Sequence, residues 1–229
     1  MKTNTQSTQK RKRKGFTLVE LLVVIAIIAS LAGLSYGPIM KHLESSARTE
    51  AISNVKNIYS AMLGYMAQND NIFPDEDALE DSETAGGGSA ASDYFQLLFD
   101  GGHVDDEKYF YHRQGEKMGL ASEKPDNDKT LSADENVWGY VEGLDPGDST
   151  SPFIFDSSED GVSFLANTWK GKAIVLKVDG GAEALKISLS GPLDTTDSSQ
   201  SGEVEIDFNG QRQNIFDTVP DHGEIITPG

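Results

Sequence analysis

A chain of 229 residues with a formal net charge of −18 is too short for a large multidomain enzyme. It is also too acidic to bind nucleic acid, because phosphate binding needs clustered basic charge. The absence of cysteine excludes disulfides, thiolate metal sites and thiol nucleophiles.

The first distinctive feature is a basic block at residues 10–14, followed by an apolar run of 21 residues from Phe16 to Tyr36. At about 1.5 Å per helical residue, this run matches a hydrocarbon layer of ~30 Å and predicts a transmembrane helix over residues 16–36. The basic block holds the N-terminus in the cytoplasm and sends the acidic remainder across the membrane. In an ordinary secretory signal the small cleavage residue follows the apolar stretch, whereas here Gly15 precedes it. Cleavage after Gly15 would therefore remove only a leader, residues 1–15.

One carboxylate, Glu20, interrupts the apolar run. Placing a carboxylate in lipid costs roughly 2.5–3.5 kcal/mol, so such a residue suggests a function. The alternative is a shallow residue whose carboxylate reaches the cytoplasmic surface. A functional carboxylate needs a cation, and cleavage after Gly15 would create one at the α-amino group of Phe16, whose pKa is about 8. That amine could belong to the same chain or to a neighbouring subunit.

The string Lys-Gly-Phe-Thr-Leu-Val-Glu-Leu-Leu-Val-Val-Ile, residues 14–25, resembles the cleavage and methylation motif of type IV prepilins and type II secretion pseudopilins. The resemblance implies that a prepilin peptidase cuts between Gly15 and Phe16, and that the same enzyme methylates the Phe16 nitrogen. It also implies that Glu20 acts in subunit docking during filament assembly. Gly37-Pro38 resembles the place where pilin helices bend, and proline there removes a backbone donor and clashes with the preceding turn.

Beyond Pro38 the chain becomes amphipathic, which predicts the second half of a long helix over residues 37–70. Its apolar positions are spaced by three or four residues. They are Leu43, Ala47, Ala51, Val55, Ile58, Met62 and Met66. Asn69-Asp70-Asn71 and Pro74 indicate the helix end.

Residues 71–229 predict a polar extracytoplasmic domain, with a short helix capped by Ser92 and ended by Gly101-Gly102. Short β-prone segments separated by Gly, Pro, Asp or Ser predict strands. They are residues 137–141, 153–155, 173–178, 184–189 and 204–208. Asp179-Gly180-Gly181 predicts a hairpin turn, and the tail from Ile215 carries no clear pattern. The predicted fold class is α+β, with the long helix packed on a small antiparallel sheet, which the pilin resemblance also implies.

No pattern in the chain predicts catalysis. The four histidines lack the spacing of a metal or nucleophile site, and neither a nucleophile elbow nor a phosphate-binding loop occurs. We therefore expect no enzymatic activity and no catalytic residue. Calcium is the one cofactor that the acidic loops suggest, since it binds hard oxygen ligands. The candidate ligands are Asp145, Asp148, Asp156, Glu159 and Asp160, although dense charge more often marks solvated loops.

Together these features predict a structural filament subunit, a pseudopilin of a type II secretion system, anchored in the inner membrane with its C-terminal domain in the periplasm. Its expected partners are the prepilin peptidase, membrane lipid, other pilin-like subunits, and an inner-membrane assembly platform with a cytoplasmic ATPase. The alternative is a major or minor type IV pilin for adhesion, motility or DNA uptake. Many pilins close their C-terminal region with a disulfide, so the lack of cysteine favours the secretion role. A third hypothesis is a membrane-tethered binding protein that uses the helix only as an anchor.

Overall fold

The computed structural model describes residues 16–82, 86–156, 158, 160–208 and 211–228, without the side chains of residues 35–38, 40, 41 and 208. The chain divides into two compact units, Met1–Glu44 and Ser45–Gly229, which share one helix, α1, from Leu18 to Met66. Gly15 and the rest of the predicted leader lie outside the described residues, and of Gly37 and Pro38 only the helical backbone within α1 is described. The leader and the bend therefore stay predictions.

Over the described residues, no helix combines the length and the apolar character needed to cross a membrane.

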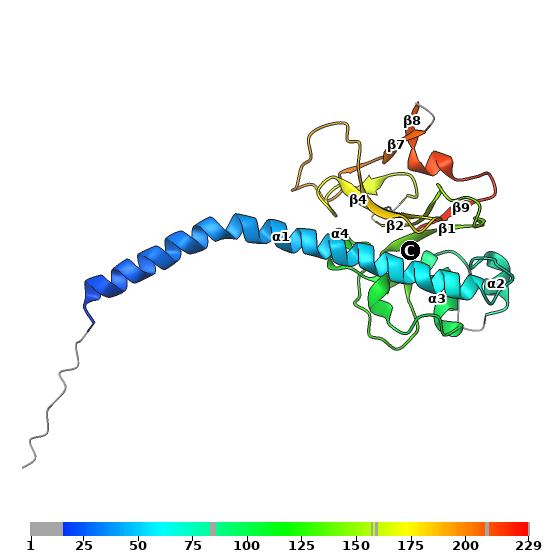
Figure 1. The fold of residues 1–229 in the computed structure, drawn as a ribbon, viewed down its shortest axis with the longest axis horizontal. Coiled ribbons are helices and arrows are strands. Elements are labelled where there is room, and N and C mark those ends of the chain that lie inside the picture. Colours follow the sequence, from blue (N-terminus) through cyan, green and yellow to red (C-terminus); the bar gives the residue numbers. More distant parts are fainter. Residues whose placement is uncertain (1–15, 83–85, 157, 159, 209–210, 229) are drawn as a thin grey trace, which may run out of the picture. The chain divides into compact units, whose positions relative to one another are not determined.

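From Ser45 onward, α1 is amphipathic and packs against the rest of the second unit (Figure 1). Four positions of the predicted stripe are fully buried. They are Ala51, Val55, Ile58 and Met62. Ala47 and Met66 are half-buried, whereas Leu43, in the first unit, is exposed. The stripe is thus confirmed from Ala47 onward and is wrong at Leu43.

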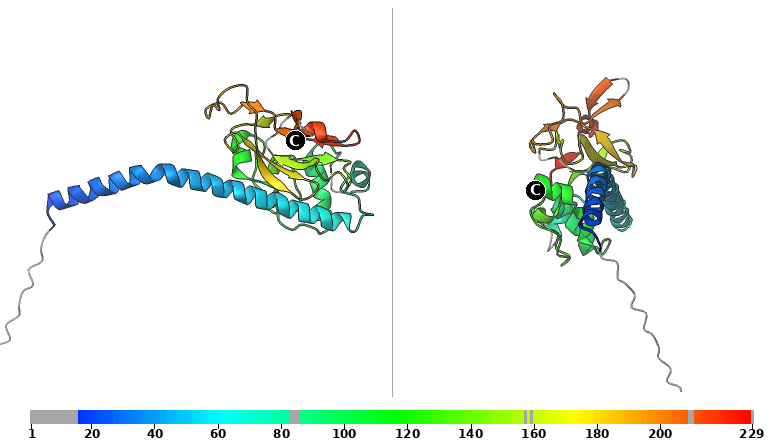
Figure 2. Two further views of the ribbon diagram at one scale, coloured as in Figure 1. Left: turned by 45° about the horizontal axis from the view of Figure 1, so that its top comes forward. Right: turned by 90° about the vertical axis from the view of Figure 1, so that its left-hand side faces the viewer.

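The second unit contains a five-stranded sheet with strand order β5-β4-β2-β1-β9, in which neighbouring strands are antiparallel (Figures 1 and 2). The strands are β1 Trp138–Glu142, β2 Pro152–Asp156, β4 Lys172–Lys177, β5 Ala182–Lys186 and β9 Glu224–Ile226. The turn predicted at Asp179-Gly180-Gly181 joins β4 to β5, and Gly180 has a φ of +83° that side-chain-bearing residues rarely adopt. A helix packed on an antiparallel sheet confirms the predicted α+β class.

The side chains of Phe153 and Phe155 on β2 pack into the hydrophobic core on opposite faces of the sheet. The register between β2 and β4 shifts between Pro152 and Ile154, a bulge that redirects the side chain beside it. Phe153 accordingly packs against Tyr59 of α1, with ring centroids 6.2 Å apart. Phe155 instead meets Phe216, with centroids 4.9 Å apart, on the side away from the helix. One strand thus joins two apolar layers.

Shorter elements surround this sheet. The helices are α2 Glu76–Glu80, α3 Ala91–Asp100 and α4 Arg113–Met118, with 3₁₀ turns at Glu107–Phe110, Ala133–Glu135 and Ile215–Thr218. Two small strand pairs are β3 Phe164–Leu165 with β6 Ser201–Gly202, and β7 Glu205–Phe208 with β8 Gln211–Asn214. Helix α3 packs on β1, where the rings of Tyr94 and Tyr140 lie 5.3 Å apart.

Most predicted elements exist with ends moved by one to three residues, but two expectations need correction. The α3 helix begins at Ala91, after the N-cap Ala90, so Ser92 does not cap it. Instead, the carboxylate of Asp93 accepts the backbone N–H groups of Ser89 and Ala90. The tail beyond Ile215, which the sequence left unassigned, supplies β9 and completes one edge of the sheet.

Candidate functional site

The start of α1 is closed by reciprocal hydrogen bonds between Thr17 and Glu20. The Glu20 carboxylate accepts from the Thr17 backbone N–H and from its hydroxyl, both at 2.8 Å. The Glu20 N–H donates to Thr17 Oγ1 at 3.2 Å. This is a capping box, in which the first and fourth residues of the helix start satisfy each other's backbone donors. The carboxylate is therefore held at the helix N-terminus, where the helix dipole also favours negative charge.

The sequence hypothesis for Glu20 named only an amine as its partner and missed Thr17. The signal was present, because Thr-x-x-Glu before an apolar run is the sequence signature of a capping box. Phe16 precedes the capping threonine directly, and its side chain is 80% exposed. Cleavage at the predicted site would place the new amine one residue before the N–H that donates to Glu20.

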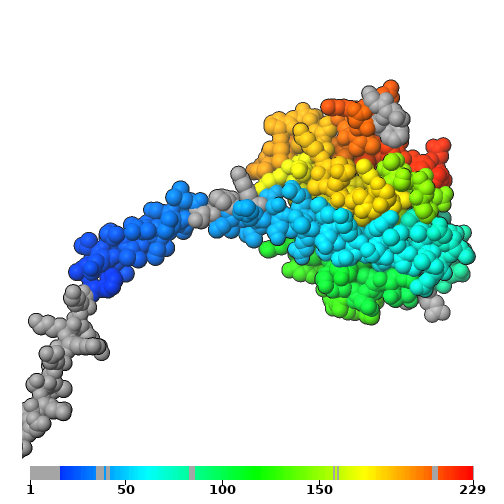
Figure 3. Space-filling model, viewed as in Figure 1, coloured from blue at the N-terminus to red at the C-terminus, as the bar shows by residue number. Residues whose placement is uncertain are grey.

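Beyond Glu20, α1 exposes a continuous apolar surface. Its large side chains from Leu21 to Leu34 are between 45% and 77% exposed, on every side of the helix. Figure 3 shows this segment in blue. A helix that is apolar all round is stable only when something covers it, such as lipid or other helices.

Small residues interrupt this surface at helical spacing. Ser30 donates its hydroxyl to the Ala26 carbonyl at 2.8 Å, so its polar atom is satisfied within the helix. At Gly33, a Cβ atom would meet no described atom within 4 Å, so the fold of the single chain does not require glycine there. Small residues four apart permit close approach of helices in lipid, which agrees with a packed helical filament.

The predicted calcium ligands do not form one group. Asp156 is fully buried on β2, where it accepts from Trp169 Nε1 and from the Ile174 N–H. Asp160 accepts the N–H groups of Val162 and Ser163, and Glu159 lies outside the described residues. These bonds give Asp156 and Asp160 structural roles in the fold.

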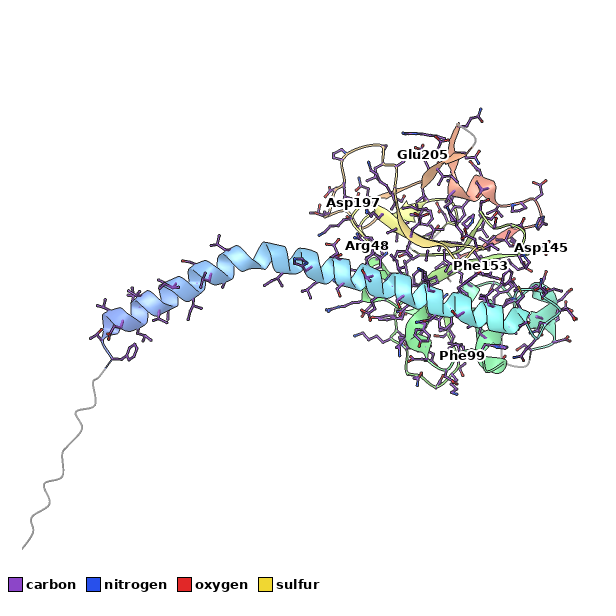
Figure 4. The ribbon with its side chains drawn as sticks, viewed as in Figure 1. Arg48, Phe99, Asp145, Phe153, Asp197 and Glu205 are labelled. Carbon is purple, nitrogen blue, oxygen red and sulfur yellow. The ribbon has the colours of Figure 1, made fainter. Side chains whose placement is uncertain are left out.

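Asp145 and Asp148 instead gather with His222, and ligand atoms of the three lie within 4.8 Å of one another. Figure 4 labels Asp145 at one end of the second unit. Asp148 already accepts from the Asp145 N–H at 2.9 Å and lies 3.2 Å from His222 Nε2. A nitrogen in this group departs from the all-oxygen ligand set that calcium prefers. Of the predicted calcium ligands, Asp145 and Asp148 are therefore the two that remain candidates, and calcium binding stays a prediction.

A second acidic group consists of Glu107, Asp126 and Asp128, with ligand atoms within 4.8 Å of one another. Glu107 is fully buried, and its carboxylate accepts the N–H groups of Asn127 and Lys129. Those bonds fix the loop around residue 127. This group is therefore explained as a loop anchor.

Among the described residues, the histidines do not form a catalytic arrangement. His112 is buried, with its ring between those of Trp138 and Trp169 at 5.3 and 4.9 Å. His103 packs edge-on against Tyr65 of α1, and His222 is exposed beside Asp148. Each of these three has a packing or charge partner that accounts for its position, and His42 is exposed on α1.

The α+β fold and the capped apolar helix start are the features that the resemblance to pilins implies. Residues 10–36 match the prokaryotic N-terminal methylation motif. The chain is 36% identical over 59 residues to the type IV major pilin protein PilA of Myxococcus xanthus, covering 26% of this chain and 27% of PilA. It is 35% identical over 72 residues to the type II secretion system core protein G of Aeromonas hydrophila, covering 31% of this chain and 50% of that protein. For core protein G of Pectobacterium carotovorum the values are 34% over 71 residues, 31% and 45%.

The matched stretch thus spans half or less of the length of each of these relatives. No solved structure matches the chain significantly. The resemblance to type IV pilins and pseudopilins is confirmed. Most of the second unit lies outside the stretch that matches these relatives.

Proposed function

We propose that the chain is a structural subunit of a type IV pilus-like filament, most closely a pseudopilin of a type II secretion system. One observation carries the proposal: within the matched methylation motif, an exposed apolar helix begins with a carboxylate held at its N-terminal end by Thr17. Covering that helix requires lipid before assembly and neighbouring subunits after it.

In this proposal a prepilin peptidase cuts between Gly15 and Phe16 and methylates the new amine. The basic leader holds the N-terminus in the cytoplasm, the apolar helix anchors the subunit in the inner membrane, and the acidic unit lies in the periplasm. An assembly platform driven by a cytoplasmic ATPase then moves the helix from lipid into a bundle of helices. During that transfer, Glu20 pairs with the Phe16 amine of the same or an adjacent subunit.

The role proposed for this chain is structural, without catalysis. The identity to the type IV major pilin of Myxococcus xanthus supports one alternative within the same class, a pilus subunit for adhesion, motility or DNA uptake. Both assignments need the same processing and the same helix. They differ in the cargo or surface ligand that the second unit meets.

The first experiment is mass spectrometry of the mature N-terminus from the native host. The expected species begins at N-methyl-Phe16. A chain that keeps Met1 as its terminus, in a host whose other prepilins are processed, would contradict the proposal.

Substitutions at Glu20 separate its charge from its role as a cap. Glu20→Gln keeps an oxygen that can accept the Thr17 N–H but removes the charge, whereas Glu20→Ala removes both. Both variants should be inserted in the membrane and lost from filaments, because neither can pair with an amine. Glu50→Gln, on an exposed part of α1, is the matched control and should assemble normally. Normal filament incorporation of Glu20→Ala would instead support the simple membrane tether.

A further inference from the structure

In the five-stranded sheet, two cross-strand pairs each join residues of like charge. Lys172 of β4 lies directly opposite Lys186 of β5, and Glu142 of β1 lies directly opposite Glu224 of β9. Like charges at such cross-strand positions are destabilising. A counter-charge from another part of this chain or from another molecule would therefore stabilise each pair.

The lysine pair lies in a basic groove. Its cavity of about 770 Å³ is lined by the cations Lys170, Lys172, Lys186 and Arg212, with apolar side chains between them. Two carboxylates share the groove, Glu205 and Asp207, and Glu205 is already paired with Arg212 at 3.8 Å. Within the part of the chain that the structure describes, Lys172 and Lys186 form no ion pair. The groove thus presents unneutralised positive charge in a unit that is otherwise strongly acidic.

The glutamate pair lies in an acidic corner made by Glu142, Glu224, Asp75 and Glu76. Glu142 accepts the Glu76 N–H at 3.0 Å, which brings the start of α2 to the sheet. Burial, together with the charges of Glu224, Glu76 and Asp75, raises the pKa of Glu142 above its ordinary value. The carboxylates of this corner therefore repel one another, and a cation from outside would relieve that repulsion.

The basic groove and the acidic corner lie diagonally opposite each other on one sheet. In the order β5-β4-β2-β1-β9, the lysine pair sits at one edge and the glutamate pair at the other. Along the strands they also lie at opposite ends. Tyr140 pairs with Ile154, so Glu142 lies at the Pro152 end of β2, and Pro152 pairs with Lys177 at the hairpin end of β4. Lys172 begins β4 at its other end. Figure 4 labels Glu205, which lines the groove, and Asp145, three residues after Glu142, at well-separated places on the unit. One chain cannot bring its own groove and corner together.

We propose that the basic groove of one chain receives the acidic corner of a second copy of the same chain. Complementary patches on different parts of a molecule form a heterologous contact, and such contacts extend into open chains when their rotation does not close. The contact would neutralise both like-charge pairs at once. It rests on the proposed filament function and adds a lateral contact between the second units to the contact made by the helices.

A structural explanation of the lysines makes a different prediction. Charged residues on edge strands such as β5 protect a sheet against unwanted pairing, and a glutamate there serves equally well. Under that explanation Lys186→Glu leaves assembly unchanged. Under the docking proposal Lys186→Glu raises the melting temperature of the single chain, because it removes the like-charge pair, and yet abolishes the contact between copies.

The absence of cysteine allows a direct test in the full-length chain expressed in its host. Ser188→Cys marks the groove and Asp77→Cys marks α2 beside the acidic corner, and both positions are exposed. Oxidation should give a ladder of dimers, trimers and longer species, since a head-to-tail contact does not stop at two. The control pair, Ser188→Cys with Lys117→Cys, should stay monomeric. Adding Lys186→Glu to the first pair should reduce the ladder to the control level.

The outcomes separate the contact from the filament. Filaments without a ladder, or a ladder that survives Lys186→Glu, overturn the docking proposal and leave the filament function intact. A ladder in membranes without any filament supports the docking and refutes the filament function. If the chain with the first cysteine pair forms neither a ladder nor filaments, and the cysteine-free chain also forms no filament, the docking contact and the filament function are both refuted.

Discussion

The buried carboxylate of Asp156 gives the sharpest stability prediction. It is fully buried and accepts from Trp169 Nε1 and from the Ile174 N–H, the latter at 2.7 Å. His112 Nε2 lies 3.4 Å from the same carboxylate. His112 Nδ1 accepts the Gly115 N–H at 2.9 Å, which leaves Nε2 as the ring nitrogen on the side of Asp156.

Asp156→Ala removes the acceptor and leaves two buried donors, Trp169 Nε1 and the Ile174 N–H, without their partner. Each unsatisfied donor costs about 1–3 kcal/mol, and relaxation limits the loss on breaking such a buried network to about 3–5 kcal/mol. For a unit of this size, each kcal/mol lowers the melting temperature by about 2–4 °C. We therefore expect a fall of roughly 8–16 °C, taking about 4 kcal/mol as the central value. Asp156→Asn keeps one oxygen for Ile174 and should lose about half as much.

The assay is thermal and chemical unfolding of the full-length chain in detergent, followed by tryptophan fluorescence. The chain has two tryptophans, and both rings flank His112, so the signal reports directly on this network. Asp221→Ala, at an exposed carboxylate, is the control and should change the free energy of unfolding by less than about 0.5 kcal/mol. A loss below about 1 kcal/mol in Asp156→Ala would refute the reasoning, because it would mean that the donors find other partners.

Three further predictions concern the same unit. Because the folded state raises the pKa of Glu142 above 4.5, the folded chain binds its proton more tightly than the unfolded chain, and stability falls as pH rises from 4.5 through the raised value. Glu142→Gln should flatten that slope in pH-dependent melts and add about 0.2–1 kcal/mol at pH 7; an unchanged slope contradicts it. Millimolar calcium should raise the melting temperature of the parent chain and not of Asp148→Asn; no rise in the parent removes the calcium proposal. Gly180→Ala should cost about 1–3 kcal/mol in urea unfolding, since φ is +83° and a Cβ would lie 2.7 Å from Tyr59 Cε1, and a neutral result would contradict that geometry.

The sequence predicted the elements whose signals are local. The buried stripe of α1, the strands around Trp138 and Ile174, and the turn at Gly180 all follow from periodicity or turn chemistry, and each is present. The short strand β9 was not predictable, because Glu224–Ile226 has three residues and becomes a strand only by pairing with β1.

The acidic residues show the limit of reasoning from composition. Asp156 and Asp145 look alike in the sequence, yet one is fully buried under Trp169 and the other is exposed. Long-range packing decides between them, since the donors to Asp156 lie 13 and 18 residues away. A list of carboxylates therefore could not distinguish a core hydrogen-bond acceptor from a surface ligand.

The capping box at Thr17 changes how the cost of Glu20 in lipid is understood. A carboxylate that already accepts two hydrogen bonds at the positive end of a helix is partly compensated before any amine approaches. Under the proposed function, an isolated subunit would then remain in the membrane with its carboxylate partly compensated, and the amine would contribute mainly on assembly. A carboxylate that lacked the cap would lose this compensation during insertion, before cleavage has created the amine. Thr17→Val should therefore reduce the membrane-inserted pool, whereas Glu20→Gln, which keeps an acceptor for the cap, should reduce filaments alone.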